Sequence, residues 1–409
     1  MTNVLRHVPQ SGLAPAQRQS LAFGALGTAL LHIVRACTGA EEWDTAHQWV
    51  TTVTRGPVAA HTEANLFYGA PAVAFVLRIA AKRSHTTVLA ALDDHITALT
   101  RARLDQAYAR ISRGELPRLG EYDLISGLTG IGVYLFQAQN ADLLREVLAY
   151  LVRLTATVTI GDRRLPGWWT LHGPSDRPDP RWPGGHANLG LAHGISGPLA
   201  LLAQTMLHGI TVPGQAEAIA DVNRVLDRWL RDFPHRPWWP GAVSAREWES
   251  ETLHQTGPQR PSWCYGTPGL ARARQLAALA LNTPERQHTA ETVLASCITD
   301  EAQLDQLRDD SLCHGWAGLV HTSRRAAEDS LRGSVLTLAF SRLHELWSRR
   351  WPYLPDTPDH KGLLEGTVGA MLVHHGGEHP VSPSSPASWW DACLLTTAPV
   401  TTTDPEGPR

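Results

Sequence analysis

The sequence lacks the features of a disulfide-rich, membrane-spanning or nucleic-acid-binding protein. Five cysteines in 409 residues are too few and too scattered for a disulfide framework. No run of 18 uncharged apolar residues occurs, which excludes a membrane-spanning helix. Charged residues make up only 18% and the formal net charge is −3, so the chain has no basic field and no nucleic-acid partner is expected.

The N-terminus also lacks a basic segment followed by a clean apolar run, so we expect no signal peptide. We expect a cytoplasmic protein, in a reducing compartment where cysteines more often serve metals or catalysis. What the sequence does have is 43% hydrophobic residues, enough for a large buried core. Length alone would favour two or three domains.

One short pattern, Gly-x-x-Gly followed by small and aliphatic residues, recurs along the whole chain. A single copy says little, but seven in order, each opening an apolar segment, are hard to obtain by chance. Glycines near a helix start let helix backbones approach one another and let the preceding loop turn sharply. Clear copies begin at Gly24, Gly127, Gly194, Gly266, Gly315 and Gly366, and a degenerate copy reads Gly69-Ala70-Pro71-Ala72.

Two kinds of helix alternate in this pattern. The segments that follow the glycines are apolar nearly all round, as expected of buried helices; the clearest are 128–137, 195–206 and 270–281. The segments between copies have one apolar stripe, as expected of half-exposed helices. These are 88–111, 141–155, 215–233, 286–297 and 335–349. The best strand candidate is 157–162.

Alternating buried and amphipathic helices predict an all-α fold in two layers. Seven such pairs could form an open superhelix or close into an α/α toroid with the buried helices inside. An open solenoid needs polar-faced caps, whereas both terminal repeats keep apolar inner segments, 28–34 and 368–373, which favours closure. Two long loops rich in Trp, Pro and Gly, 161–192 and 233–263, suit either the walls of a binding site or aromatic plugs over the barrel end.

Three copies carry a soft or titratable residue just before the first glycine. They read Cys264-Tyr265, Cys313-His314 and Ala192-His193. In a closed toroid these positions lie at one end, so distant residues would converge there. Cys264, Cys313 and His314 then offer two thiolates and one imidazole, a three-ligand zinc set with one position open. The alternative is two small buried cysteines and a packed histidine.

Other residues near the glycines could carry acid–base chemistry. His193 could be a fourth ligand, a general acid/base or a satisfied core histidine. Asp123 could orient His193 or simply cap a helix. Arg260 could stabilise an anion or lie exposed in a loop, and the role of Tyr265 is equally open.

These residues resemble the lanthionine synthetase C-like family, the cyclases of lanthipeptide biosynthesis. The resemblance covers about residues 15–396, and its strongest part is the ordered pair Trp-Cys-Tyr-Gly, then Cys-His-Gly. The motifs that carry it are Tyr122 to Gly130, Pro166 to Trp168, Asn188 to Gly197, Trp263 to Gly266 and Cys313 to Gly315.

The resemblance implies a double α-toroid of seven inner and seven outer helices in a single domain over 15–396. An N-terminal arm, 1–14, would precede it, and a disordered tail, 397–409, would follow. It also implies one zinc ion per chain held by Cys264, Cys313 and His314, with His193 as acid/base surrounded by Asp123, Arg260 and Tyr265.

The implied activity is addition of precursor-peptide cysteine thiols to dehydroalanine or dehydrobutyrine, which forms (methyl)lanthionine thioether rings. The partners implied are the dehydrated precursor peptide and a separate dehydratase, because only about 20 residues precede the first repeat. An export transporter, and membrane association through such partners, are compatible with this picture.

Three other functions stay open on the sequence. A non-catalytic zinc-containing toroid could be a scaffold that binds a peptide or a dehydratase. A toroid glycoside hydrolase should show paired carboxylates, and the cluster Glu247, Glu249 and Glu251 has no partner motif. A zinc prenyltransferase subunit would also activate a thiol, so only a substrate test separates it.

Overall fold

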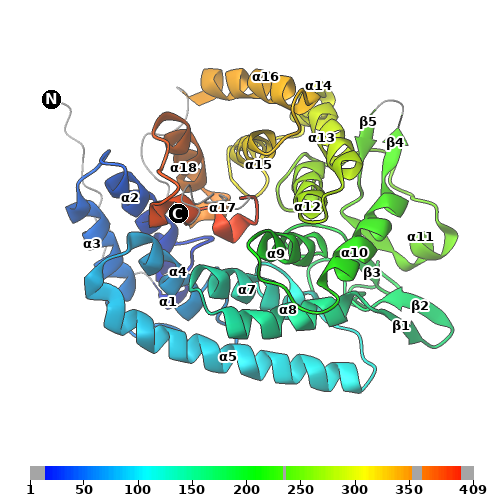
Figure 1. The fold of residues 1–409 in the computed structure, drawn as a ribbon, viewed down its shortest axis with the longest axis horizontal. Coiled ribbons are helices and arrows are strands. Elements are labelled where there is room, and N and C mark those ends of the chain that lie inside the picture. Colours follow the sequence, from blue (N-terminus) through cyan, green and yellow to red (C-terminus); the bar gives the residue numbers. More distant parts are fainter. Residues whose placement is uncertain (1–13, 234–235, 352–361, 398–409) are drawn as a thin grey trace, which may run out of the picture.

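A computed structural model describes residues 14–233, 236–351 and 362–397 of the chain. Seven helices form an inner ring, and each begins directly after the first glycine of a repeat, or two residues later in the fourth copy (Figure 1). The degenerate copy at Gly69 contributes a helix like the others, so the predicted count of inner helices is confirmed. They are α2 (Ala25–Cys37), α4 (Ala70–Ala80), α7 (Leu128–Gln137), α9 (Ser196–Leu207), α12 (Thr267–Ala280), α15 (Trp316–Glu328) and α18 (Thr367–Glu378).

Amphipathic helices surround this ring, each placed in sequence between two inner helices (Figure 1). They are α3 (Trp43–Thr54), α5 (Thr86–Ser112), α8 (Ala141–Thr155), α10 (Gln215–Trp229), α13 (Pro284–Thr299) and α16 (Val335–Arg350). The α/α toroid is therefore confirmed, but the described part of the chain contains six long outer helices rather than the expected seven. After α18 it forms only the 3-10 turns η3 (Pro386–Trp389) and η4 (Ala392–Leu394).

Hydrogen bonds between the loops that precede the inner helices close the ring. The first and last repeats are joined, because Leu363 N donates to Leu21 O (2.9 Å) and Leu364 N to Ala22 O (3.0 Å). This bonding excludes the open superhelix. The other junctions are Leu21 N to Phe67 O (2.9 Å), Cys313 N to Leu364 O (2.8 Å), Cys264 N to Cys313 O (3.3 Å), Leu191 N to Cys264 O (2.8 Å) and Leu124 N to Ala192 O (3.1 Å).

In the six clear copies, the second glycine of the motif is required by the turn that leads into the helix, whereas the degenerate copy has Ala72 at this place. A Cβ at Gly269 would lie 2.0 Å from the carbonyl oxygen of Trp263, and one at Gly318 would lie 2.0 Å from that of Leu312. No side chain fits at such a separation. The residue three positions before the first glycine, whose carbonyl makes this contact in the six clear copies, is fully buried at the centre of the ring in all seven: Leu21, Leu66, Leu124, Leu191, Trp263, Leu312 and Leu363.

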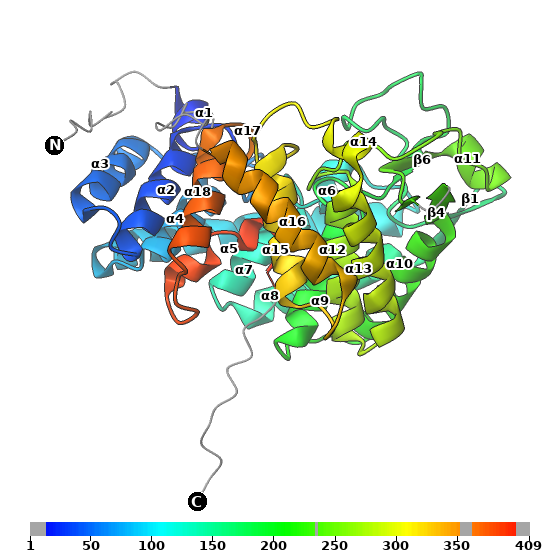
Figure 2. The ribbon, with the colours of Figure 1, turned by 90° about the horizontal axis from the view of Figure 1, so that it is seen from above.

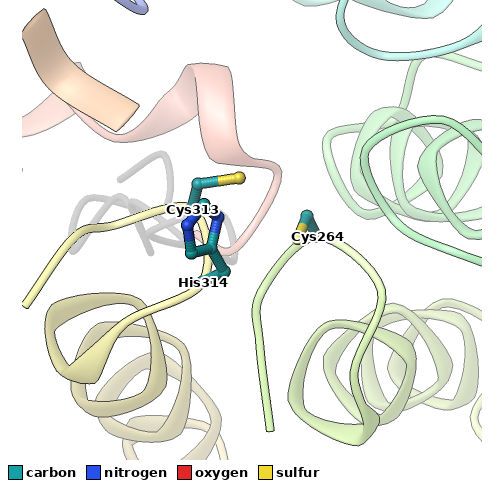
Figure 3. A group of neighbouring side chains, drawn as sticks. All are labelled: Cys264, Cys313 and His314. Atoms are coloured by element: carbon teal, nitrogen blue, oxygen red, sulfur yellow. The ribbon is translucent and has the colours of Figure 1, made fainter. Parts of the chain in front are cut away.

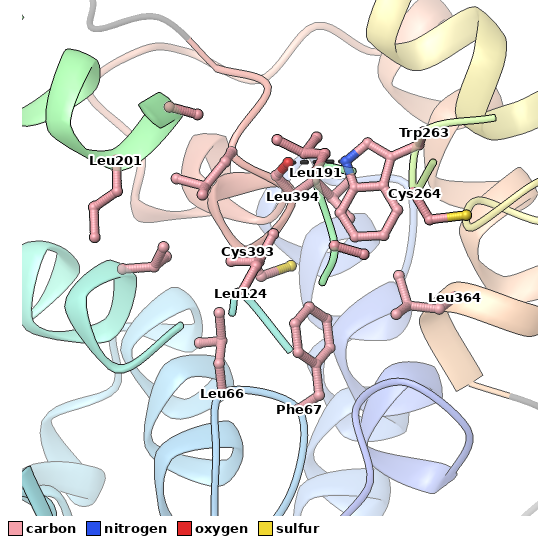
Figure 4. Close-up of a cluster of buried hydrophobic side chains, with 14 of the residues drawn as sticks. Leu66, Phe67, Leu124, Leu191, Leu201, Trp263, Cys264, Leu364, Cys393 and Leu394 are labelled. Atoms are coloured by element: carbon pink, nitrogen blue, oxygen red, sulfur yellow. Dashed lines mark hydrogen bonds between the residues drawn. The ribbon is translucent and has the colours of Figure 1, made fainter. Parts of the chain in front are cut away.

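The chain after α18 folds back into the middle of the toroid. The indole nitrogen of Trp263 donates to Leu394 O (2.9 Å), and Cys393 and Leu394 pack among the central leucines (Figure 4). Arg272, fully buried on α12, donates to Thr396 O (2.7 Å). The C-terminal segment thus supplies core that a seventh outer helix would not.

Short strands lie outside the toroid as three two-stranded antiparallel pairs. They are β1 (Thr157–Ile160) with β2 (Arg163–Pro166), β3 (His186–Asn188) with β6 (Ala242–Ser244), and β4 (Arg231–Phe233) with β5 (Arg236–Trp238). The strand expected at 157–162 is β1. Of the other strands, β2, β3, β5 and β6 fall in the two Trp-rich loops, and β4 ends where the second of these loops begins. The helix α11 (Ala245–Ser250) follows β6.

Five shorter helical segments complete the description. The short helices α6 (Leu119–Tyr122), α14 (Glu301–Leu304) and α17 (Gly362–Glu365) precede inner helices and lie on one side of the ring (Figure 2). The others are α1 (Pro15–Arg18) and the 3-10 turn η1 (Arg83–His85). No helix among the described residues is long and apolar enough to cross a membrane. The predicted arm and tail lie almost wholly outside the described residues, so the domain boundaries stay predictions.

A buried histidine anchors the C-terminal segment and makes stability depend on pH. His321 and Asp391, both fully buried, are 2.9 Å apart through Nε2 and Oδ2, and Arg325 donates to the same oxygen (2.8 Å). Burial lowers the pKa of His321 to about 4. Between this value and the ordinary pKa of 6.5, only the unfolded chain binds the proton, so stability falls as pH is lowered through that window.

We expect this group alone to cost about 2 kcal/mol of unfolding free energy between pH 7 and pH 5. The fall in melting temperature over that range should be smaller for His321→Gln, which keeps a donor for Asp391, than for the wild type. His288→Gln, a change at an exposed site, is the control. An equal fall in all three proteins would show that His321 is not held neutral by the fold.

Candidate metal centre and active site

The loops that enter α12 and α15 bring three metal-ligating side chains together. The ligand atoms of Cys264, Cys313 and His314 all lie within 4.8 Å of one another (Figure 3). Within the described residues, this is the only such cluster of three or more His, Cys, Asp or Glu side chains. The backbone bond from Cys264 N to Cys313 O ties the two loops directly, so ring closure itself sets the distance between the thiols.

Each of the two thiols shifts the pKa of the other. A hydrogen bond from Cys313 holds the pKa of Cys264 well below its usual range, whereas the same contact raises the pKa of Cys313. The hydrogen bond to Cys264 likewise raises the pKa of His314. Two thiolates and an imidazole this close repel unless a proton or a cation lies between them. Soft sulfur donors with one imidazole suit Zn²⁺, so the residues fit the metal that the sequence predicted.

Two carboxylates flank the candidate ligand His314. Its Nε2 lies 3.5 Å from Asp309 Oδ2 and 3.6 Å from Glu365 Oε2. Carboxylates in this position orient metal-bound histidines and raise their basicity. Sequence reasoning missed both. Glu365 could have been found, because it directly precedes Gly366, the position that His314 occupies in its own repeat.

His193 and Asp123 form a hydrogen-bonded pair from two neighbouring repeats. His193 Nδ1 lies 2.6 Å from Asp123 Oδ2, with Asp123 almost fully buried and the His193 side chain 37% exposed. The other carboxylate oxygen, Oδ1, accepts from Ser126 N (2.6 Å) and Gly127 N (2.9 Å). Asp123 therefore does both things considered for it, because one oxygen caps the turn and the other orients His193.

This pairing controls the protonation of His193. Burial alone would lower its pKa, but the hydrogen bond and the charge of Asp123 outweigh burial and raise the pKa above its ordinary value. The imidazolium therefore persists to higher pH than in an isolated histidine. A group of this kind can hold a proton near neutral pH and release it to a bound molecule.

Asp123→Asn tests the pair, since asparagine keeps the capping oxygen but places an amide against His193. We expect the pKa of His193 to fall by about one unit or more, because the neutral amide no longer stabilises the imidazolium. The His193 ring-proton resonance followed by NMR against pH measures this shift. Asp142→Asn, a change on the exposed face of α8, should leave the titration unchanged. An unshifted His193 in Asp123→Asn would show that the carboxylate only caps the turn.

Tyr265 and Arg260 lie around the same centre. The Tyr265 ring stacks on His193 with centroids 6.0 Å apart, and Asn188 Nδ2 donates to its hydroxyl (3.3 Å). Burial raises the pKa of Tyr265, so its hydroxyl stays protonated. The hydrogen bond with Cys264 and burial raise the pKa of Cys313, and the positive charge of Arg260 partly opposes this rise. All seven residues predicted for the site thus gather on one face of the toroid, and Asn188 is an addition.

Comparison with known proteins identifies the family. The model of the lanthionine synthetase C-like proteins matches residues 15–393, nearly the whole chain. The chain belongs to the lanthionine synthetase C-like family. The resemblance expected from the Trp-Cys-Tyr-Gly and Cys-His-Gly motifs is therefore confirmed.

Two relatives bear on the family assignment. Nisin biosynthesis protein NisC from Lactococcus lactis subsp. lactis is 26% identical over 288 residues, which are 67% of this chain and 64% of NisC. The alignment thus spans a little under two thirds of the length of this curated relative. Among solved structures, nisin cyclase superposes with a TM-score of 0.74 at 21% identity, covering 93% of this chain and 92% of that one. The latter supports the toroid as the fold of this family member.

Proposed function

We propose that this member of the lanthionine synthetase C-like family is a zinc-dependent lanthipeptide cyclase. The observation that carries the proposal is the convergence of Cys264, Cys313 and His314 at one end of the toroid, beside the pair of His193 and Asp123. The names of its relatives, a nisin biosynthesis protein and a nisin cyclase, agree with this assignment.

The proposed reaction adds a cysteine thiol of the substrate peptide across the double bond of a dehydroalanine or dehydrobutyrine. The substrate thiol gives up its proton to solvent, a bond forms between sulfur and Cβ, and the π electrons move onto Cα and its carbonyl as an enolate. A proton delivered to Cα completes a (methyl)lanthionine. Because atoms are only rearranged, the product has the same mass as the substrate.

The metal that fits this site is one Zn²⁺ per chain, held by Cys264, Cys313 and His314. Bound zinc supplies a Lewis acid that lowers the pKa of a substrate thiol, so that the nucleophilic thiolate is available near neutral pH. Asp309 and Glu365 orient His314. The three ligands come from two loops, and the backbone hydrogen bonds that close the ring hold these loops together.

The remaining side chains handle the charge and the proton. His193, kept protonated by Asp123, delivers the proton to Cα of the enolate. The guanidinium of Arg260 stabilises the negative charge of the enolate as it forms. Tyr265 stacks on His193 and offers a hydroxyl hydrogen bond to the peptide, with Asn188 fixing the hydroxyl.

The substrate of this reaction is a dehydrated precursor peptide, so a dehydratase must act before the cyclase. The dehydratase we propose is a separate protein, and an export transporter is a further proposed partner. We propose that the enzyme acts in the cytoplasm and meets the membrane only through such partners.

A thiol count tests the proposal. A peptide containing dehydroalanine and cysteine is incubated with zinc-loaded protein, treated with a thiol-alkylating reagent and weighed by mass spectrometry. Cyclised cysteines gain no alkyl group, so enzyme-dependent loss of the added mass, beyond the rate without enzyme, is the expected result. Tight peptide binding with every thiol still alkylated would favour the scaffold function instead.

A further inference from the structure

One junction of the ring differs from the others. Among the described residues, six of the seven junctions between neighbouring repeats have a direct backbone hydrogen bond. The loop before α4 and the loop before α7 have none between them, although Leu66 lies close to the start of α7: a Cβ added at Gly130 would be 3.1 Å from that of Leu66. The loop before α7 is the one that carries Asp123.

A guanidinium from the outer layer fills this gap. Arg103, half-buried on α5, donates through Nη1 to Ser126 O (2.8 Å) in the loop before α7. Through Nη2 it donates to Thr62 O (2.7 Å) and Ala64 O (3.0 Å) in the loop before α4. The planar fork of arginine suits this bridge, because its two terminal nitrogens can reach two separate loops at fixed geometry. Arg103 thus closes the seventh junction.

The bridge continues directly into the His193 pair. The peptide unit of Ser126 to Gly127 accepts from Arg103 at its carbonyl oxygen and donates at its nitrogen to Asp123 Oδ1 (2.9 Å). Ser126 N donates to the same carboxylate oxygen (2.6 Å), and Asp123 Oδ2 holds His193. We infer that Arg103 is a positioning residue for the site, because it fixes the turn that aims Asp123 at His193. This inference rests on the proposed function for its effect on catalysis, but not for its effect on the loop.

The test compares Arg103→Gln and Arg103→Lys with Arg101→Gln, a change at an exposed position on the same helix. Amide hydrogen exchange at Ser126 and Gly127 reports the loop whether or not the protein cyclises peptides. In Arg103→Gln we expect exchange at these two amides to accelerate about tenfold or more, while zinc content is unchanged. The exchange rates in Arg103→Lys should lie between those of the wild type and of Arg103→Gln. An ammonium can donate to one loop but lacks the planar fork that reaches both.

The kinetic readouts separate positioning from general support of the fold. In Arg103→Gln we expect kcat for cyclisation to fall about tenfold while KM stays within about twofold, since the metal ligands and the remaining walls are untouched. The basic limb of the pH–rate profile should move to lower pH as Asp123 loses its aim at His193. Arg101→Gln should match the wild type in every measurement.

The inference is overturned if exchange at Ser126 and Gly127 in both Arg103 variants equals that of the wild type. It is also overturned if these amides exchange faster while kcat and the pH profile are unchanged, since the bridge would then support only stability. A wild-type protein that does not cyclise, but whose loop loosens in Arg103→Gln, would refute the proposed function and leave the Arg103 bridge established.

Discussion

Replacing Cys313 by alanine is expected to abolish cyclisation. Alanine removes one of the two thiolates and leaves Cys264 and His314, too few donors to retain zinc firmly. Loss of a group that merely supports a ligand costs about 10- to 100-fold in metal affinity, so loss of a ligand should cost more than that. The cyclisation rate should fall to that of the reaction without enzyme. Zinc competition with a chelating dye and the thiol count measure the two effects.

Cys297→Ala is the matched control for that experiment. Cys297 is fully buried on α13 and its thiol donates to Gln303 Oε1 (3.2 Å), away from the cluster. Its loss should lower stability, but zinc affinity and rate per folded molecule should stay at wild-type values. A Cys313→Ala protein that cyclises as fast as Cys297→Ala would rule out the metal-based account.

The second large effect is expected from His193→Asn. Asparagine retains polarity but cannot carry the proton, so the rate should fall by about 10²- to 10⁴-fold, the usual contribution of a positioned acid. Zinc content should be unchanged, because His193 lies outside the ligand cluster. The residual product should also contain both configurations at Cα, since solvent would then protonate the enolate from either face.

His95→Asn, at an exposed position on α5, controls for the loss of a histidine as such. Chiral analysis of the hydrolysed product gives the configuration, and the thiol count gives the rate. Cyclisation by His193→Asn at the wild-type rate, with a single configuration, would remove His193 from the mechanism.

The inner ring could be predicted from the sequence because its cause is local and repeated. Each second glycine faces a carbonyl three residues before the first glycine, so the motif marks every turn into a buried helix. The lack of a seventh outer helix after α18 in the described residues could not be predicted in this way. The segment of Asp391 to Thr396 is held by single distant contacts, such as Arg272 with Thr396 and Trp263 with Leu394, which leave no periodic pattern.

The residues of the candidate site could likewise be predicted only where they occupy a fixed place in the repeat. Cys264, Cys313, His314 and His193 occupy fixed places in the repeat, so a closed ring was enough to bring them together. Asp309 could not be predicted, because only the folded loop places its carboxylate beside His314. Glu365 was overlooked, although it directly precedes the first glycine of its repeat, as His314 does in its own.

Arg103 lies outside every repeat motif, in the middle of a long outer helix. Its partners are backbone carbonyls, which any sequence supplies, so nothing in the residue types of the two loops points to it.

The central claim is that ring closure builds a zinc centre, and elemental analysis of the purified full-length protein tests it most directly. Protein prepared without chelators should contain about one zinc per chain, the load of a single mononuclear site. The same preparation of Cys313→Ala should contain little, and that of Cys297→Ala should match the wild type. Wild-type protein that holds no zinc, even after incubation with the ion, would contradict the account and leave the toroid without its proposed chemistry.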